Sequence, residues 1–401
     1  MRILVASTAG AGHFNPLVPL LEAFGRRGDD VCIVGPPSLE AAAAATSHRF
    51  RAGAEPPADE QAAVWERFTT ASGAETSGLI DRELFGRLCT EAMLPAMEKV
   101  CDEWRPHLVV RETCEYASAV VAERSGIPHA QVAISLAAVE ASVVPLVAPV
   151  LQRHVEGMAT ALLRAPYLSP FPESLDPSPY ARTRRWRASA AAGRHELPDW
   201  WRGSRAPLVY VTFGSVTGGL PIAASTFRAA IEAVAALPAR VLVTIGRAAD
   251  PASLGRLPEN VHVEAWVPQA DVLATAAAVV CHGGSGTTLG ALSAGVPLVV
   301  VPLFADQPAN GRLVTAAGAG VVLQPGRDPA GAMAVLRSEE AAELRALVER
   351  VLGEPSYSEA ARRIADEMGA VPTVDELIGD IATELLAPPR GGGSSPGAES
   401  P

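Results

Sequence analysis

Lysine is nearly missing from this chain, and basic charge is in the minority. Lys99 is the only lysine, and 44 acidic residues outnumber 33 basic ones, which gives a formal net charge of −11. A nucleic-acid-binding protein would favour a basic balance or a basic stripe. The densest basic run, RTRRWR at residues 182–187, could form a phosphate or nucleic-acid patch, but we interpret it as a solvated linker or loop. The sequence therefore predicts no nucleic-acid partner.

Paired cysteines and clean apolar runs are also lacking. The five cysteines form no CxxC pair, which fits a reducing cytosol and offers no zinc framework. The N-terminal MRILVAS is too short for a signal peptide and resembles a first strand. The most apolar stretch, residues 130–151, contains Gln131, Glu140 and two prolines, whereas a membrane span needs about 20 clean apolar residues. We predict a buried strand and a loop there, no membrane contact, and a cytoplasmic location.

What the first half does contain is an alternation of short apolar runs and helical patterns. Helices are predicted at 16–27, ending at Gly28, and at 116–124; strands are predicted at 3–6, 31–34, 107–110 and 130–134. Residues 55–100 are more polar, and we expect an acceptor loop followed by a helix from about Leu79. The βαβα order indicates a parallel sheet covered on both faces.

The pattern breaks between Pro166 and Pro207, where seven prolines fall, and we take this segment as the connection between two domains. A second series follows, with strands predicted at 208–213, 240–245, 261–264, 277–281 and 297–301 and a long helical region at about 329–386. The predicted fold class is α/β, with two doubly wound Rossmann-like domains facing a cleft. Ligands of such sheets bind outside the carboxyl ends of the strands.

The domain boundaries follow from this series. We predict an acceptor-binding domain at 1–190, a linker at 191–207, a donor-binding domain at 208–371, a helix at 372–387 that packs back on the first domain, and a disordered tail at 388–401.

The most informative segment is CHGGSGTTLGALSAGVPLVVVPLFADQPAN at residues 281–310. His282 ends a predicted strand, Gly283 and Gly284 permit a tight turn, and a helix begins directly after them. The free N–H groups of a helix start form an anion site, to which a histidine adds a donor or a charge. The alternative is a core histidine beside an ordinary turn. We favour a phosphate site formed by His282, Gly284, Ser285, Gly286 and Thr287.

Further donor-site candidates follow other strands of the same half. Gly214 and Ser215 form a turn that can supply more phosphate contacts, or a plain strand-to-helix turn. Trp266 can stack on a planar base, worth about 1–3 kcal/mol, while the Val267 backbone reads base edges. The alternative for Trp266 is a buried core position.

Asp306 and Gln307 are adjacent in a loop after a strand. A carboxylate and an amide in this position can bind sugar hydroxyls. Asp306 can also be a helix N-cap. Phosphate contacts together with hydroxyl-binding side chains predict a nucleotide-sugar site.

WVPQ, HGGSGTTLGAL and DQPAN, in this order and spacing, resemble the donor-binding signature of family 1 glycosyltransferases with the GT-B fold. The nearest resemblance is to bacterial enzymes that glycosylate natural products such as macrolides, enediynes and aromatic polyketides. The resemblance is strong in the C-terminal half and moderate in the first half. It implies inverting transfer from a nucleotide-activated sugar with no cofactor and no metal, and the lack of an Asp-x-Asp motif agrees.

The resemblance also implies residue roles. Gln269 would lie near the base that stacks on Trp266, the His282 segment would bind the diphosphate, and Asp306 with Gln307 would hold the sugar. Members that use UDP-sugars commonly have a Glu where this chain has Gly290, so the sequence favours a dTDP-sugar.

The catalytic residues are expected in the first half. The turn after the first strand has Asn15 where a dinucleotide fingerprint needs its third Gly, so NAD binding loses support. His13 occupies the position of the family's catalytic base, and imidazole has a suitable pKa. Glu112, or else Glu115, would orient it. The alternatives are a histidine that caps or packs against a helix, and surface acids.

We therefore expect an inverting glycosyltransferase that moves a (deoxy)sugar to a natural product. The apolar content of residues 55–100 and 135–165 predicts a hydrophobic aglycone. A nucleotide-sugar epimerase and a non-catalytic auxiliary protein are the alternatives, and His13 favours catalysis. The sequence does not distinguish O-, N- and C-glycosylation, and it leaves open whether the protein forms a homodimer.

Overall fold

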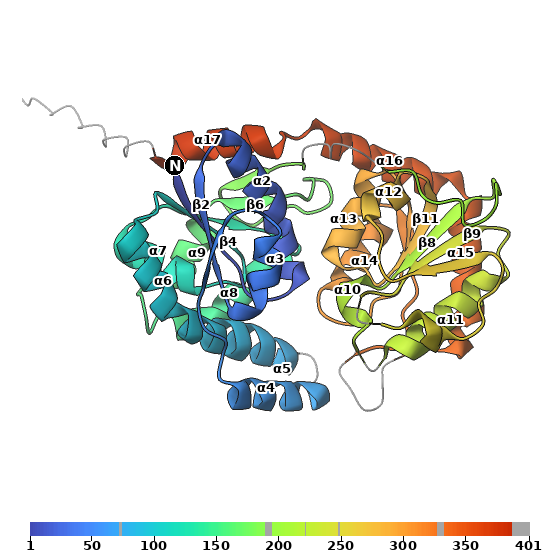
Figure 1. Ribbon diagram of the computed structural model, residues 1–401, viewed down its shortest axis with the longest axis horizontal. Coiled ribbons are helices and arrows are strands. Elements are labelled where there is room, and N and C mark those ends of the chain that lie inside the picture. The colour runs from blue at the N-terminus through green and yellow to red at the C-terminus, as the bar shows by residue number, and fades with distance from the viewer. Residues whose placement is uncertain (72–73, 189–194, 221, 248, 327–332, 387–401) are drawn as a thin grey trace, which may run out of the picture.

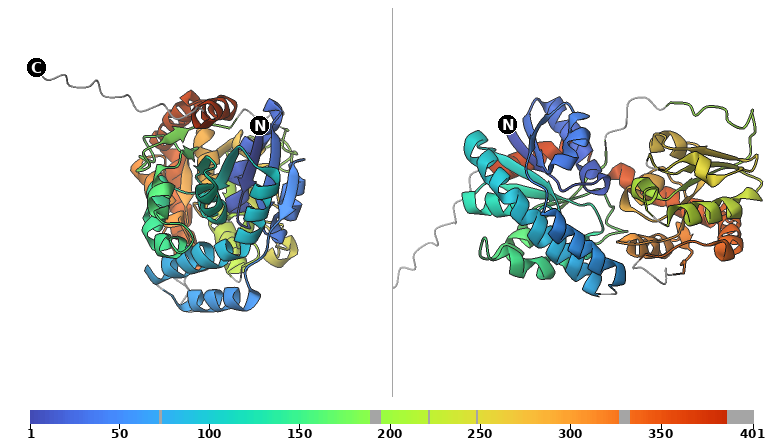
Figure 2. Two further views of the ribbon diagram at one scale, coloured as in Figure 1. Left: turned by 90° about the vertical axis from the view of Figure 1, so that its left-hand side faces the viewer. Right: turned by 60° about the horizontal axis from the view of Figure 1, so that its bottom comes forward.

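The computed structural model describes residues 1–71, 74–188, 195–220, 222–247, 249–326 and 333–386. These residues form two α/β units that lie side by side (Figures 1 and 2). The first sheet has the strand order β3-β2-β1-β4-β5-β6-β7 and the second has the order β10-β9-β8-β11-β12-β13. Neighbouring strands are parallel throughout, which confirms the predicted fold class.

The first unit is built on β1 (Arg2–Ala6), β2 (Asp30–Gly35), β3 (Arg49–Ala52), β4 (Leu108–Glu112), β5 (His129–Val132), β6 (Tyr167–Ser169) and β7 (Thr183–Arg185). Side chains alternate between the two faces of a strand, so Ile3 and Val5 join the core under α2 (Val18–Arg27), and Leu4 and Ala6 join the opposite core. The helices of that face include α6 (Thr90–Trp104) and α7 (Ala117–Ser125). Before α2 lie α1 (Ala11–Phe14) and the 3-10 turn η1 (Asn15–Leu17).

Two predicted loops of this unit contain helices instead. The acceptor loop predicted from residue 55 contains α4 (Ala58–Thr70) and α5 (Ala74–Ser77), whereas the helix predicted from about Leu79 is present and begins as the π-helix η3 (Gly78–Cys89). The loop predicted after β5 is α8 (Ala137–Leu151), which carries Pro145 and Pro149 inside it. Burial of Val144, Val147 and Leu151 against η3 stabilises α8 despite the two prolines, because apolar packing outweighs intrinsic propensity.

The proline-rich connection was also placed too early. Residues 167–169 and 183–185 are strands of the first sheet, so only the later part of the segment links the units. The basic run lies on this edge strand: Arg185 bonds to Glu173 and to the carbonyl oxygens of Phe171 and Asp176. Smaller elements of the first unit are η2 (Pro37–Leu39), α3 (Glu40–Ala44) and α9 (Met158–Arg164).

The second unit is built on β8 (Leu208–Thr212), β9 (Arg240–Thr244), β10 (Val261–Glu264), β11 (Ala276–Cys281), β12 (Leu298–Val300) and β13 (Gly320–Val322). Its helices are α10 (Gly214–Thr217), α11 (Ala223–Ala235), α12 (Gln269–Leu273), α13 (Ser285–Ser293), α14 (Gln307–Ala316), α15 (Ala341–Gly353) and α16 (Pro355–Ala370), with the 3-10 turns η4 (Pro251–Leu254) and η5 (Ser338–Glu340). The predicted long C-terminal helix is thus interrupted, because Pro355 and Pro372 fall at its breaks.

The last helix, α17 (Val374–Leu386), lies along the first unit and contacts α2 (Figure 1). Leu377 and Ile378 are buried in the core that α2 covers. The Arg26 guanidinium makes two bonds of 2.9 Å to the Asp375 carboxylate. The predicted tail at 388–401 and residues 191–194 of the predicted linker lie outside the described residues. Within the described ranges, no helix has the length and apolar character that a membrane crossing requires.

Candidate active site

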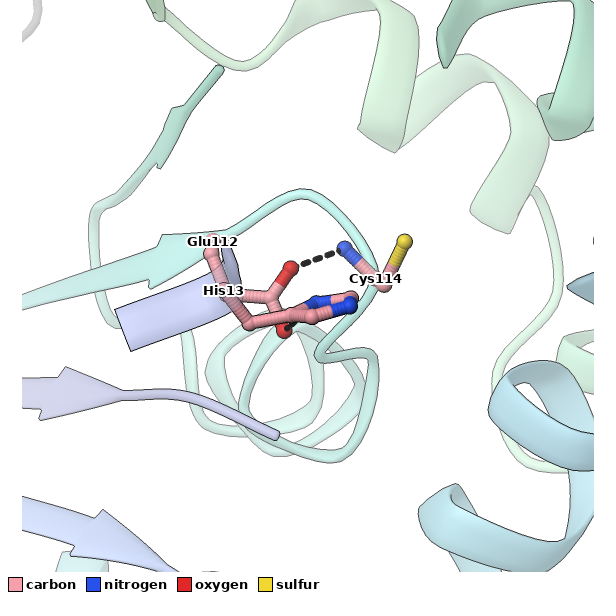
Figure 3. A group of neighbouring side chains, drawn as sticks. All are labelled: His13, Glu112 and Cys114. Atoms are coloured by element: carbon pink, nitrogen blue, oxygen red, sulfur yellow. Dashed lines mark hydrogen bonds and ion pairs between the residues drawn. The ribbon is translucent and has the colours of Figure 1, made fainter. Parts of the chain in front are cut away.

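His13 and Glu112 meet where two adjacent strands end. β1 pairs with β4, so the turn after β1, which carries His13, lies beside the end of β4, which carries Glu112. The His13 Nδ1 lies 3.3 Å from the Glu112 Oε1, an ion-pair contact that does not meet the geometry of a hydrogen bond. Figure 3 shows the Glu112 carboxylate between the His13 ring and the backbone nitrogen of Cys114.

The Glu112 carboxylate is fully buried and held by three donors from the protein. The backbone N–H and the hydroxyl of Thr8 donate to Oε1 at 3.1 and 2.7 Å, and the Cys114 N–H donates to Oε2 at 2.5 Å. Burial acts to raise the pKa of Glu112, but the charge of His13 and these bonds outweigh it and hold the pKa below its usual range. Glu112 is therefore a fixed anion.

The electrostatics of His13 are the counterpart. Burial acts to lower the pKa of His13, but the neighbouring Glu112 charge outweighs it, with smaller contributions from Glu140 and Asp306, and the net pKa is raised. The Phe85 ring of η3 covers the imidazole at a centroid distance of 5.1 Å. The site thus stabilises an imidazolium, which is the state that a general base reaches after taking a proton.

Glu115 faces a different partner. Its two oxygens accept from the Ser118 N–H at 3.2 and 3.1 Å, and the Ser118 hydroxyl donates to it as well. Burial raises the pKa of Glu115 to about 7. Of the two acids, Glu112 is the one that lies beside His13. Glu115 instead accepts hydrogen bonds from Ser118 in the first turn of α7.

A metal-like grouping exists at the same place. Ligand atoms of His13, Glu112 and Cys114 lie within 4.8 Å of one another. Burial raises the pKa of the Cys114 thiol well above its usual value, and a protonated thiol is a poor ligand. Both Glu112 oxygens already accept hydrogen bonds, so this donor set suits proton transfer better than metal coordination.

On the second unit, His282 follows β11 and its ring fits between two glycines. A Cβ built on Gly214 or on Gly284 would lie 2.7 or 2.5 Å from the His282 Nε2. β8 and β11 are neighbours in the sheet, which brings the Gly214 turn beside the His282 turn. Glycine is therefore required at both positions by the ring itself.

His282 is a neutral imidazole at physiological pH. Burial lowers its pKa to about 4, and its Nδ1 is buried without a hydrogen-bond partner. The sequence suggested that His282 could supply either a hydrogen-bond donor or a positive charge to an anion. The neutral ring supplies a donor and no charge. An anion bound here would raise this pKa by favouring the charged form.

The start of α13 is open in the way an anion site requires. Gly284 occupies the N-cap position and has no side chain to cap the helix, so the first N–H groups of α13 are free to donate to a ligand. Gly286 is exposed and has open space above it, and Ser215 is exposed on α10. Thr287 is buried, and its hydroxyl accepts from the Gln269 amide at 3.2 Å.

Asp306 occupies the N-cap position of α14, but its side chain makes no capping hydrogen bond to the helix. Its Oδ2 accepts from Ser285 at 2.9 Å, from Asn310 at 3.2 Å and from Ser135 of the first unit at 2.7 Å. The Gln307 Oε1 is occupied by two backbone N–H groups of the preceding loop, at 2.8 and 3.0 Å. Only the Gln307 amide nitrogen is left for a ligand.

Sequence reasoning overlooked Asn310, which belongs to the quoted DQPAN motif. Asn310 is buried, and its amide also donates to the Gly283 carbonyl at 2.8 Å. Its spacing of four from Asp306 on one helix could have indicated it. Thr8, Ser135 and Phe85 carried no comparable signal.

Trp266 is 53% exposed, so the core alternative is wrong for it. The Arg247 guanidinium carbon lies 4.5 Å from the centroid of a Trp266 ring, within cation–π range. Val267 is half-buried on the core of the second unit, and Gln269 begins α12 and reaches Thr287. The hydrogen bond from Gln269 to Thr287 ties the segment after β10 to the first turn of α13.

Two family models match this chain. The N-terminal domain of the erythromycin biosynthesis protein CIII-like family matches residues 39–214, and the C-terminal domain of the same family matches residues 228–384. The chain belongs to this family of bacterial natural-product glycosyltransferases. The predicted family and enzyme class are confirmed.

Similarity to curated relatives covers nearly the whole length of this chain. The chain is 31% identical over 397 residues to L-demethylnoviosyl transferase of Streptomyces niveus, covering 96% of this chain and 98% of that protein. It is 30% identical over 412 residues to elloramycin glycosyltransferase ElmGT of Streptomyces olivaceus, covering 97% and 98%. The protein is thus a glycosyltransferase of antibiotic biosynthesis.

Solved structures agree on the fold. The calicheamicin glycosyltransferase CalG4 superposes with a TM-score of 0.78 at 24% identity, covering 96% of this chain and 99% of that chain. SsfS6 of Streptomyces sp. SF2575, complexed with thymidine diphosphate, gives a TM-score of 0.73 at 26% identity, covering 96% and 99%. The GT-B fold is confirmed.

Proposed function

We propose that this glycosyltransferase moves a (deoxy)sugar from a dTDP-sugar to a hydrophobic natural-product aglycone, with inversion at the anomeric carbon. The observation that carries the proposal is the pairing of two half-sites. A His13–Glu112 dyad lies on the first unit, and the second unit has an uncapped helix start beside a neutral His282. The contact between Ser135 and Asp306 brings the strand ends of the two units together.

The preference for a dTDP-sugar has two supports. SsfS6, a 26% identical structure, holds thymidine diphosphate. In this chain, a Cβ on Gly290 would lie 2.9 Å from the Gln269 Oε1 and 3.2 Å from a Leu273 methyl group. An acidic side chain at this position would have to displace the end of Gln269 before it could reach ribose hydroxyls, which favours a deoxyribose.

The proposed chemistry is a single displacement. The acceptor oxygen attacks the anomeric carbon while His13 takes its proton, and the bond from that carbon to the diphosphate oxygen breaks. Glu112 stabilises the resulting imidazolium. The departing dTDP is stabilised by the N–H groups of α13 and the His282 donor, and Asp306 with the Gln307 amide nitrogen binds the sugar.

The test is a matrix of dTDP-sugars and aglycones, followed by nucleotide release and product mass. Nucleotide release that requires an acceptor supports transfer. Conversion of the sugar without an acceptor would mean epimerisation, and binding with neither outcome would mean an auxiliary protein.

The base is tested by His13→Ala. We expect transfer to fall by about 10²–10⁴-fold, the usual contribution of a positioned base. Equilibrium binding of dTDP stays unchanged, because its contacts lie on the other unit. Unchanged turnover would remove His13 from the mechanism. We also propose a cytosolic location, because all five cysteines are free thiols.

A further inference from the structure

Ser135 is a first-unit residue that touches the donor half of the site. It lies in the loop between β5 and α8, is 8% exposed, and donates through its hydroxyl to the Asp306 Oδ2 at 2.7 Å. The two residues are 171 positions apart and belong to different units. This hydrogen bond therefore exists only while the two units are together.

Two buried acidic side chains fix the backbone of the loop that carries Ser135. The buried Glu140 carboxyl group accepts from the N–H groups of Ile134 and Ser135 at 2.8 and 2.7 Å, and burial raises its pKa to about 8. The Asp176 carboxylate accepts from the Ala137 N–H at 2.9 and 3.1 Å. Two acids thus hold the backbone on both sides of Ser135, so its hydroxyl is presented at a defined point.

The same acid joins this loop to the catalytic dyad. The hydroxyl of Thr113, the residue after Glu112, donates to the Glu140 Oε1 at 2.9 Å, and the Tyr167 hydroxyl donates to Oε2 at 2.7 Å. The Glu112 loop and the Ser135 loop are therefore held by one buried carboxyl group.

The three donors to Asp306 share one oxygen. Among the described residues, the hydrogen bonds to its carboxylate come from Ser135, Ser285 and Asn310, and all of them end on Oδ2. Three donors on one oxygen fix the plane of the carboxylate. Oδ1 is left as an acceptor with a set direction.

We propose that Ser135 is a positioning residue for donor recognition. By bonding to Oδ2 it orients Asp306 so that Oδ1 accepts from a hydroxyl of the donor sugar. The acceptor unit thereby completes the sugar site, and sugar recognition is linked to closure of the two units. The inference rests on the proposed donor function of Asp306, and it adds a first-unit residue to that site.

The test separates the sugar from the nucleotide. Binding of dTDP and of a panel of dTDP-hexoses is measured by calorimetry for the wild type, Ser135→Ala, Ser135→Thr and Ser142→Ala. Ser142 is the matched control, since it is an exposed serine of α8 whose hydroxyl, within the described part of the chain, donates only to the Val139 carbonyl.

For Ser135→Ala we expect binding of the dTDP-hexoses to weaken about tenfold, the usual scale for a hydrogen bond to a charged group. Binding of dTDP alone stays within twofold. In turnover, KM for the donor rises about tenfold and kcat falls less than threefold. Ser135→Thr keeps a hydroxyl and restores binding to within threefold, and Ser142→Ala matches the wild type.

Three results would overturn the inference. Unchanged hexose binding would show that Ser135 does not orient Asp306, and tighter binding would show that it competes with the sugar. An equal loss for dTDP and dTDP-hexoses would point to a general structural effect. If the wild type binds none of these ligands, the proposed function itself fails.

Discussion

Glu112→Gln tests the dyad most sharply, because it removes a charge and keeps the size of the side chain. At 3.3 Å from the His13 Nδ1 and an effective dielectric constant of about 20, the interaction of unit charges is about 5 kcal/mol. This attraction opposes the burial of His13 and keeps its pKa raised. Without it, burial remains, and the pKa of His13 falls.

The orientation of the new amide can be derived from its partners. Its oxygen will occupy the Oε1 position, where the two Thr8 donors and His13 converge, because an NH₂ group there would face three donors. The NH₂ group then faces the Cys114 N–H, and one buried donor loses its acceptor, at about 1–3 kcal/mol. The imidazole keeps its tautomer but loses the countercharge of its protonated state. We expect kcat to fall about 10²-fold, the lower end of the range for acid–base catalysis.

The pH profile of kcat/KM gives the decisive measurement. A general base works only when neutral, so wild-type activity declines as the pH falls through the raised pKa of His13. In Glu112→Gln this acidic limb moves to lower pH, while the maximum rate drops. Glu115→Gln is the control, since Glu115 faces Ser118 and its loss leaves the acidic limb in place. An acidic limb that stays put or moves upward in Glu112→Gln would refute the coupling of Glu112 to His13.

Three further outcomes follow from the geometry. Gly284→Ala should weaken dTDP binding at least tenfold, since its Cβ would meet the His282 ring at 2.5 Å; Gly369→Ala, with open space around it, is the matched control in the same titration. Trp266→Ala should weaken dTDP binding by about 1–3 kcal/mol if the base stacks on the exposed indole, and an unchanged affinity contradicts stacking. Ile378→Ala, on the buried side of α17 and 2% exposed, should reduce the free energy of unfolding by about 2–5 kcal/mol, seen as a lower melting temperature.

Most of the parallel strands of the second unit were predictable because both of their faces are buried, as in β8, β9, β11 and β12, whereas the edge strand β10 is half-buried. β10 occupies the predicted residues 261–264, and β8, β9, β11 and β12 lie within one residue of their predicted bounds. Such strands appear as nearly continuous apolar runs. β3 is half-exposed, and β6 and β7 are three residues long and lie among prolines, so no apolar run marks them.

Helices stabilised by tertiary contacts were the main failures. α8 contains two prolines and remains helical because its apolar side chains pack against η3 and join the core that contains Leu4 and Ala6. η3 falls where a helix was predicted from about Leu79, but it is a twelve-residue π-helix, a conformation that the sequence did not indicate. It matters for function, because it sets the Phe85 ring over His13.

The donor half was easier to predict than the acceptor half, for a physical reason. Phosphate binding uses consecutive backbone N–H groups and the residue before them, so its residues are contiguous in sequence. The contacts that fix Asp306 and Glu112 come from Ser135 and Thr8, which are distant in sequence and depend on how strands align. Such partners follow from the folded sheet and not from a motif.

The glycines around His282 show how two turns combine into one site. Gly284 has φ −62°, a conformation open to any residue, so its own turn does not require glycine. Gly214 has φ +78° and would be glycine for backbone reasons alone. At both positions, however, a side chain would collide with the same His282 ring, although the two glycines are far apart in sequence. The phosphate site therefore depends on the pairing of β8 with β11, and a chain that kept the His-Gly-Gly turn but gained a side chain at Gly214 would displace the His282 donor.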